Sequence, residues 1–242
     1  MNPAPPDIAG IWVYLSASPL LWLTATLAAY VAADRIAARS GRHPIANPVV
    51  IAASILVALL LATGTSYAAY FEGAQFVHFM LGPATVALAV PLWRNLALVR
   101  KSLLPMAAAL IAGSVTAAAS AVLIAAAFGA PAEVLASLAP KSTTAPIAME
   151  LSKSLGGIPA LTAVLVVMTG IIGAVVVTPL MNALKITNFA ARGFAAGVAS
   201  HGIGTARAFQ VSEIAGTFAG IAMGLNGALT SVLVLLWLAF AG

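Results

Sequence analysis

The sequence predicts an all-α integral membrane protein, and three observations support this fold class. Of the 242 residues, 62% are hydrophobic and only 7% are charged, whereas about 25% of the residues in an average soluble domain are charged. The apolar residues form long runs, and a helix needs about 20 of them to cross a bilayer. Most basic residues flank these runs, as Lys and Arg do in the cytoplasmic loops of membrane proteins. We therefore expect one transmembrane domain over residues 1–242 with about six to eight transmembrane segments.

Eight apolar segments follow one another along the chain. They cover roughly residues 11–33, 47–64, 74–93, 103–128, 132–152, 158–184, 190–210 and 213–241. The loops 34–43 and 94–101 are rich in Arg and Lys, whereas no basic residue lies near Glu72 or Glu133. The positive-inside rule then places both basic loops in the cytoplasm and the N-terminus outside. The C-terminus is expected outside whether the interrupted segments span the membrane or re-enter. In the second half of the chain, basic residues occur in successive loops, so the rule chooses no side there.

The composition argues against several kinds of site. The chain has no cysteine, and its three histidines and six acidic residues are too scattered to suggest a metal site. No nucleophile elbow, phosphate loop or pair of acids marks an enzyme, and the adjacency of Ser200 and His201 does not align a nucleophile with its base. Nucleic-acid binding requires basic residues that cluster on one face, whereas the basic residues behind the net charge of +5 are spread along the chain. We expect no enzymatic activity, no cofactor, no metal ion and no nucleic-acid partner.

The segment 132–152 contains the first candidate binding site. Its centre reads Pro140-Lys141-Ser142-Thr143-Thr144-Ala145-Pro146 and continues as Ile147-Ala148-Met149-Glu150. Thr143 or Thr144 can cap a helix whose first turn contains Pro146, so we expect a half-helix that begins inside the protein. Its free N–H groups, with Lys141 beside them, favour an anion. The alternative is a loop outside the bilayer whose lysine binds lipid phosphate.

The segment 190–210 contains the second candidate site. Its centre reads Ala199-Ser200-His201-Gly202-Ile203-Gly204-Thr205-Ala206-Arg207. Gly202 and Gly204 favour a break, and we expect the helix to restart near Thr205. An arginine at the bilayer centre costs about 2.5–3.5 kcal/mol on insertion scales, so Arg207 is expected either to bind an anion or to pair with a glutamate. His201 is either a proton carrier or a neutral, hydrogen-bonded residue of the core.

Two further polar features lie within apolar segments. Gly82-Pro83-Ala84-Thr85 interrupts the segment 74–93 and is either a third part of the site or a kink in a packed helix. Asn226 is an isolated amide in the last segment, where a hydrogen bond between helices is the expected role. Neither feature moves the expected site away from the segments 132–152 and 190–210.

The architecture of the interrupted segments is open in two respects. Both 132–152 and 190–210 are compatible with a broken spanning helix or with a re-entrant helix, provided that protein or a cavity covers the non-helical backbone. An internal repeat is expected because the stretch 82–85 resembles 202–205, and 113–115 resembles 230–232, at an offset of about half the chain. Transporters often contain such repeats with interrupted helices.

At these motifs the sequence resembles the LrgB/CidB family of bacterial membrane proteins. The match is carried by residues 71–73, 81–92, 140–150, 156–163 and 199–208, and it covers about residues 45–240. Bacterial members of this family are described as holin-like or antiholin-like proteins tied to murein hydrolase release and cell lysis. A plastid relative carries glycolate and glycerate, and bacterial relatives are linked to pyruvate uptake. The resemblance implies a multi-pass protein of the bacterial cytoplasmic (inner) membrane with a small LrgA/CidA-like membrane partner, and it is compatible with a homo-oligomer.

The polar residues favour a carrier among the functions that the resemblance implies, because a protein that only opens holes does not need Lys, His and Arg on interrupted helices. We expect a transport domain that carries small monocarboxylates of the glycolate, glycerate, pyruvate or lactate class by alternating access. Control of murein hydrolase release and lysis is the alternative. Proton coupling through His201 or Glu150 and exchange of two anions are both open. The expected substrate-binding residues are Lys141, Ser142, Thr143, Thr144, Ser200, His201, Gly202, Gly204, Thr205, Arg207, Gly82, Pro83 and Thr85.

Overall fold

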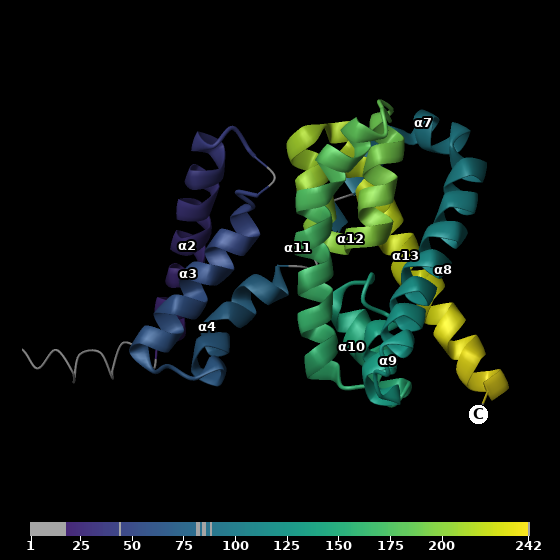
Figure 1. Cartoon of the computed structure of the whole chain (residues 1–242). Coiled ribbons are helices and arrows are strands. Elements are labelled where there is room, and N and C mark those ends of the chain that lie inside the picture. Colours follow the sequence, from purple (N-terminus) through teal and green to yellow (C-terminus); the bar gives the residue numbers. More distant parts are fainter. Residues whose placement is uncertain (1–17, 44, 81–82, 84–85, 88, 242) are drawn as a thin grey trace, which may run out of the picture. The chain divides into compact units, whose positions relative to one another are not determined.

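The described part of the protein is built from α-helices (Figure 1). The computed structural model describes residues 18–43, 45–80, 83, 86–87 and 89–241, and no strand occurs within these ranges. The predicted all-α fold class is confirmed. The helices are α2 (Pro19–Arg39), α3 (Pro48–Thr63), α4 (Tyr67–Phe79), α6 (Ala89–Arg94), α7 (Leu96–Lys101), α8 (Leu103–Ala127), α9 (Ala132–Leu138), α10 (Ala145–Ser154), α11 (Pro159–Ala183), α12 (Phe189–Val211) and α13 (Glu213–Ala241).

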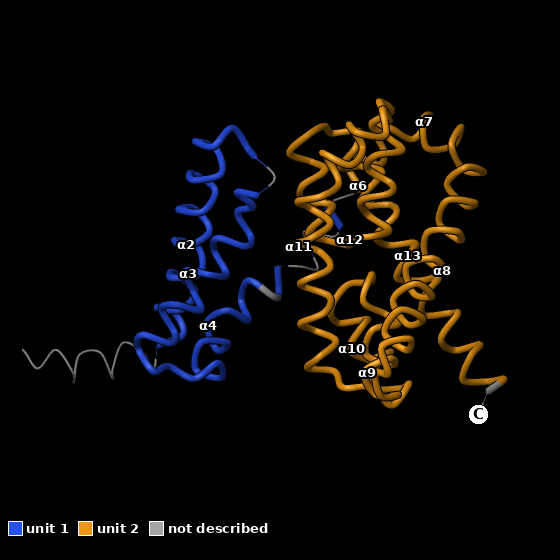
Figure 2. The backbone as a smooth tube through the Cα atoms, in the orientation of Figure 1, with its two compact units in different colours: residues 1–87 blue, residues 88–242 orange. Residues whose placement is uncertain are grey.

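The chain divides into two compact units, residues 1–87 and residues 88–242 (Figure 2). Four of the described helices are long and apolar enough to cross a membrane: α2 in the first unit, and α8, α11 and α13 in the second. Helices α8 and α11 have 25 residues each, so each is about 38 Å long and exceeds the hydrocarbon core of about 30 Å. The protein is therefore a multi-pass membrane protein. The expected single transport domain over residues 1–242 stays a prediction.

The first unit packs α3 and α4 against α2. Gly73 allows α4 to approach α2 closely, because a Cβ at this position would lie 2.2 Å from the carbonyl oxygen of Pro19. The Trp22 side chain is fully buried, and its ring meets the ring of Tyr70 edge-on with the centroids 5.9 Å apart. The unit thus has an aromatic contact of its own at the α2–α4 interface.

Helix α12 in the second unit turns back on itself. The backbone leaves helical geometry at Ser200 (φ −135°, ψ 15°) and at His201 (φ 41°, ψ −133°). A Cβ on Gly204 would lie only 2.7 Å from the carbonyl oxygen of Ala196, whereas residues eight apart in a straight helix are separated by about 12 Å. The predicted interruption of segment 190–210 is confirmed, and the segment is re-entrant.

We call residues 189–211 hairpin 2 and Ser200–His201 its tip. The helix resumes at Gly202, directly after the positive φ of His201, and so earlier than the predicted restart near Thr205. The glycines do not form the break itself, since Gly204 instead provides room for the two arms to approach. A residue other than glycine in such a conformation costs about 1–3 kcal/mol, so the contacts around His201 must hold the tip in place.

The segment 132–152 also forms a re-entrant structure. Helices α9 and α10 lie at the same end of the second unit and are joined by residues 139–144 (Figure 1). They contact each other, and both contact α11. Thr144 is the N-cap residue of α10 and Pro146 lies in its first turn, as the sequence predicts. We call residues 132–154 hairpin 1 and residues 139–144 its tip.

The base of hairpin 1 is fastened to the start of α11. The hydroxyl of Thr162 lies 2.7 Å from Oγ of Ser152 and 3.2 Å from the carbonyl oxygen of Ser137. Oγ of Ser137 accepts a hydrogen bond of 2.8 Å from the backbone N–H of Ile158. A Cβ on Gly157 would lie 2.9 Å from the backbone nitrogen of Ser137. This end of the unit is therefore tightly packed and rich in hydrogen bonds.

The order of elements in the second unit is an inverted repeat. Helix α8 crosses the unit, hairpin 1 enters from the far end, α11 returns, hairpin 2 enters from the near end, and α13 crosses again (Figure 1). Helices α8 and α11 have equal lengths and begin 56 residues apart, at 103 and 159, while the hairpins begin 57 residues apart, at 132 and 189. The predicted repeat with re-entrant helices is confirmed, but its offset is about half of the one expected. The expected offset came from short stretches of Gly, Ser, Thr and Val, which are common throughout this sequence.

Hairpin 2 packs against α13 through glycines. A Cβ on Gly193 would lie 2.0 Å from the carbonyl oxygen of Ala215, and a Cβ on Gly197 would lie 2.1 Å from that of Ala219. Small residues at one face let two membrane helices approach until their backbones touch. The first arm of hairpin 2 is thereby held along the first half of α13.

We expect Gly197→Ala to lower the thermal unfolding midpoint of the protein purified in detergent, because its methyl group has no room against the backbone of α13. Overpacking of this kind costs about 1–3 kcal/mol. The matched control is Gly224→Ala on α13, where a Cβ meets no atom within 4 Å. Equal midpoints for the two variants would contradict the proposed close packing.

Candidate functional site

Asn226 of α13 joins the tip of hairpin 1 to the end of the first arm of hairpin 2, two residues before its tip. Its side chain is fully buried, and its amide nitrogen donates to the carbonyl oxygens of Ser142 in hairpin 1 (3.1 Å) and of Val198 in hairpin 2 (3.2 Å). Its amide oxygen accepts a hydrogen bond of 2.6 Å from the hydroxyl of Ser114 on α8. The prediction that the two interrupted segments approach each other inside the protein is confirmed.

This joint lies near the middle of the long helices. Asn226 is close to the midpoint of α13 (Glu213–Ala241), and Ser114 is close to the midpoint of α8 (Leu103–Ala127). At such a depth no lipid group can hydrogen-bond to a non-helical backbone, and each unsatisfied polar group costs several kcal/mol. The amide of Asn226 supplies the donors that two of these carbonyl groups need.

The tip of hairpin 2 rests on two glycines of α11. Nε2 of His201 lies 2.9 Å from the carbonyl oxygen of Val166, so this nitrogen carries the hydrogen and donates it. A Cβ on Gly170 would lie 2.7 Å from Cε1 of His201, and a Cβ on Gly173 would lie 1.6 Å from Oγ of Ser200. Only glycine at these two positions lets the tip approach α11. The bond to Val166 leaves Nδ1 of His201 as the nitrogen that can accept a hydrogen bond or a proton.

Lys141 supplies a positive charge at the tip of hairpin 1. Its side chain is half-buried, and it lies close enough to His201 for the two groups to interact electrostatically. No acidic side chain in the described ranges forms an ion pair with Lys141. Helix α10 begins four residues later, at Ala145, and its N-terminus carries free N–H groups and a positive dipole end. This part of the site has the chemistry to hold an anion.

The hydroxyl groups near the tips are partly engaged within the protein. Thr143 donates to the carbonyl oxygen of Pro140 (2.9 Å), and Thr205 donates to that of His201 (2.8 Å). A threonine that already donates its hydrogen can still accept one. Thr143 is fully buried, whereas Thr205 is 5% exposed, so only Thr205 of the two has surface left for a donor such as a substrate hydroxyl. Its role in binding the substrate, like that of Thr143, stays a prediction.

Arg207 lies on the second arm of hairpin 2, six residues beyond the tip, which is about 9 Å along a helix. Its side chain is 8% exposed and donates to Oε1 of Gln210 at 3.2 Å. It lines a small cavity together with Arg192 and Gly193 of the first arm. The structure thus places Arg207 between the arms of the hairpin and away from the tip. Its role in binding the substrate stays a prediction.

The remaining predicted site residues are less closely tied to the tips. Glu150 is exposed on α10, and the carboxylate of Glu213 lies 3.9 Å from the guanidinium of Arg94. Pro83 is exposed and belongs to the first unit. Two further predicted residues, Gly82 and Thr85, lie outside the described residues. Their contribution stays a prediction.

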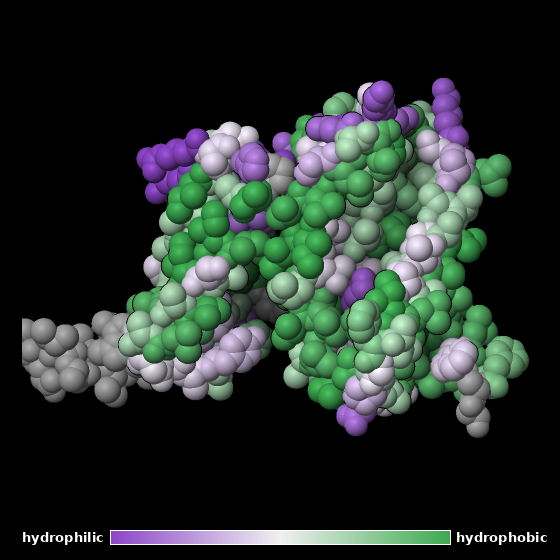
Figure 3. All heavy atoms as spheres, in the orientation of Figure 1, coloured by the Kyte–Doolittle hydropathy of each residue, from purple (hydrophilic) through white to green (hydrophobic). Residues whose placement is uncertain are grey.

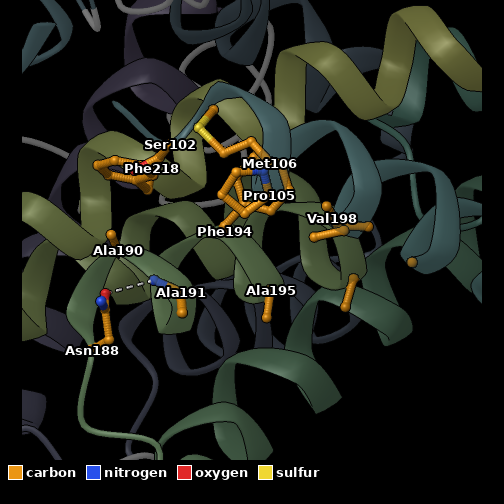
Figure 4. A pocket seen from close by; sticks show the side chains of 13 residues that line it. Ser102, Pro105, Met106, Asn188, Ala190, Ala191, Phe194, Ala195, Val198 and Phe218 are labelled. Atoms are coloured by element: carbon orange, nitrogen blue, oxygen red, sulfur yellow. Dashed lines mark hydrogen bonds between the residues drawn. The ribbon is translucent and has the colours of Figure 1, made fainter. Parts of the chain in front are cut away.

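A cavity of about 510 Å³ lies between α8 and the first arm of hairpin 2 (Figure 4). Most of its lining is apolar, with Met106 and Phe194 on its walls (Figure 4). It extends from Ser102 and Asn188, at the starts of α8 and α12, to Val198 near the hairpin tip. The polar joint therefore has an open space beside it on one side.

These features define a multi-pass helical membrane protein in which two re-entrant hairpins from opposite ends meet at a buried polar joint. The chain belongs to the LrgB-like family, whose profile matches residues 26–240. It is 35% identical to YwbG of Bacillus subtilis (strain 168) over 205 residues, which are 85% of this chain and 91% of YwbG. It is 31% identical to the holin-like protein CidB of Staphylococcus epidermidis (strain ATCC 12228 / FDA PCI 1200) over 221 residues, 91% of this chain and 95% of that protein. No solved structure matches the chain.

Three residues of the site were not identified from the sequence as parts of it. Asn226 was expected to join two helices, whereas it joins both hairpins and α8. Gly170 and Gly173 stand in a long apolar run where glycines are frequent. An asparagine close to the midpoint of a spanning helix was the one available signal, since buried amides are rare in apolar segments and need several partners.

We expect Asn226→Leu to destabilise the protein by about 1–3 kcal/mol, because it leaves two buried carbonyl groups without their donor. The measurement is thermal unfolding in detergent. The companion variant Ser114→Ala removes a single hydrogen bond and should cost only about 0.6 kcal/mol, the average for such bonds between membrane helices. If Asn226→Leu is as stable as the unmodified protein, the joint does not hold the tips.

Proposed function

We propose that this protein is a carrier of small monocarboxylates of the glycolate, glycerate, pyruvate or lactate class. The observation that carries the proposal is the meeting of two re-entrant hairpins beside a lysine that has no acidic partner among the described residues. A lysine at this depth is expensive, and a visiting anion would compensate its charge. Carriers commonly bind their substrates where interrupted helices of two repeats meet.

The proposed binding mode places the carboxylate between Lys141 and the N-terminus of α10. The ammonium group provides charge-assisted hydrogen bonds, and the helix end provides N–H donors. A hydroxyl group of glycolate or glycerate would donate to Thr205, which keeps acceptor capacity. Coupling to a proton, through Nδ1 of His201 or through Glu150, and exchange of two anions are both compatible with this arrangement.

A holin-like role in the release of murein hydrolases is the second candidate function. It is favoured by the relatives from Staphylococcus epidermidis and Staphylococcus aureus (strain N315), which are named holin-like protein CidB. In this case the chain would assemble with an LrgA/CidA-like partner or with further copies of itself, and it would pass solutes without saturation. The two functions therefore differ in a measurable way.

We also propose that the protein lies in the bacterial inner membrane with both termini outside. At the end of the second unit where α7 lies, hydrophilic side chains gather, and further hydrophilic atoms are visible at mid-height (Figure 3). We call this end, where α7 and the start of α12 lie, the basic end. The basic residues at this end are Arg94, Arg100, Lys101, Lys185 and Arg192, whereas the opposite end carries only Lys153 among the described residues. Positive residues favour the cytoplasmic side.

Counterflow into liposomes tests the carrier. Liposomes loaded with unlabelled glycolate or pyruvate should take up labelled substrate in a saturable manner, and Lys141→Ala should weaken apparent affinity roughly ten- to a hundredfold, because a charge-assisted hydrogen bond of about 1.5–3 kcal/mol is lost. The matched control is Lys153→Ala, which removes the same charge from the other end of hairpin 1 and should leave exchange unchanged. Leakage without saturation would instead support the holin-like function, and normal exchange by a folded Lys141→Ala variant would remove Lys141 from the site.

Cysteine labelling tests the orientation. Because the chain has no cysteine, Ser40→Cys and Ser154→Cys each introduce a single thiol, at the end of α2 and at the end of α10. In intact cells an impermeant thiol reagent should label position 154 and leave position 40 unlabelled. The reverse pattern would show that the basic loops face outward.

A further inference from the structure

Resting on the proposed carrier function, we propose that the cavity between α8 and hairpin 2 is the route by which the substrate anion reaches the hairpin tips from the basic end. The structure described would then be the state of the carrier that is open to this end. The walls of this cavity are distinct from Lys141 and from the N-terminus of α10.

The cavity extends from the basic end of the second unit to the neighbourhood of the hairpin joint. Its outer end is formed by Ser102, directly before α8, and by Asn188, the N-cap residue of α12. Its inner end is formed by Gly113, Val198 and Ala199. Val198 gives its carbonyl oxygen to Asn226, and Ala199 directly precedes the tip of hairpin 2. The cavity therefore ends beside the joint, one residue before the tip of hairpin 2.

The mouth of the cavity has a charge that suits an anion. Arg100 and Lys101, in the last turn of α7, directly precede Ser102. A cleft beside charges of one sign raises the local concentration of oppositely charged solutes. These side chains would attract a carboxylate to the mouth without holding it inside the cavity.

The walls suit passage better than binding. They consist mainly of small apolar residues, with Ala109 and Gly113 on α8 and Ala195 on hairpin 2. The side chain of Asn188 is engaged, since it accepts a hydrogen bond of 3.1 Å from the N–H of Ala191 (Figure 4). A volume of about 510 Å³ admits a C2 or C3 carboxylate with its hydration shell, since one water molecule takes about 30 Å³. Weak contacts along the way would let the substrate move on toward the hairpin tips.

The opposite end is tightly packed where the base of hairpin 1 meets the start of α11. The hydroxyl of Thr162 contacts Ser152 and Ser137 there. A Cβ on Gly157 would have no room against Ser137. An alternating-access carrier needs such an asymmetry, in which one side of the site is open while the other is closed. The packed base and the open cavity lie on opposite sides of the same joint.

A matched pair of cysteines on α8 tests the route. Ala109→Cys places a thiol in the cavity, and Ala108→Cys places one next to it on an exposed position that does not line the cavity. In membrane vesicles the small anionic reagent sulfonatoethyl methanethiosulfonate should reach position 109 from the side that also labels Lys101→Cys. Reaction at 109 should be at least about tenfold faster than at 108, because thiols in apolar surroundings form little thiolate. The attached sulfonate should then reduce glycolate counterflow in the Ala109→Cys protein.

Each other outcome overturns the proposal in a distinguishable way. Equal, slow labelling at 108 and 109, with 109 reactive only towards an uncharged maleimide, means that lipid or another apolar group fills the cavity. Labelling of 109 from both sides means a continuous pore. Fast labelling of 109 without any effect on counterflow means that the substrate takes another way, while the carrier function stands. If the unmodified protein shows no saturable counterflow, the proposed function fails and the route fails with it.

Discussion

The second unit depends on one constraint: a backbone that leaves the helix in the middle of a membrane must still find a partner for every polar group. Neither hairpin tip meets this requirement alone, because each has carbonyl groups that no helix satisfies. The amide of Asn226 gives one donor to each hairpin and takes one hydrogen bond from Ser114. A single residue thus makes both interruptions compatible with the bilayer and fixes them against each other.

The glycines of the second unit follow from the same constraint. Asn226 reaches both tips only if hairpin 2 lies tightly against α13 and α11. Gly193 and Gly197 allow the first contact, and Gly170 and Gly173 allow the second. Close packing of this kind compensates for the positive φ of His201, whose ring is also held by the carbonyl oxygen of Val166. Packing, strain and hydrogen bonding are therefore parts of one arrangement rather than separate features.

The joint of the two hairpins bears on function because the polar groups around it have partners, whereas the charge of Lys141 has no acidic partner among the described residues. The hydroxyls of Thr143 and Thr205 and the amide of Asn226 have partners within the protein, whereas Lys141 has no acidic partner among the described residues. A protein that serves only as an assembly partner gains nothing from a half-buried ammonium group beside a helix N-terminus. Relatives named holin-like protein CidB share most of the length of this chain.

The sequence by itself determined the class of the protein, the positions of α8, α11 and α13, and the two segments that are interrupted, whereas the predicted segment 74–93 is divided between α4 and α6. These are local properties: hydropathy specifies α8, α11 and α13, and Thr144 with Pro146 specifies the start of α10 inside the membrane. Whether the segments cross or return, which residues pair, and the register of the repeat were decided by the tertiary structure. The contacts between Asn226 and Ser142, and between His201 and Val166, join residues 84 and 35 positions apart. No local pattern reports such contacts, because the energy of a buried hydrogen bond depends on which partner the fold brings to it.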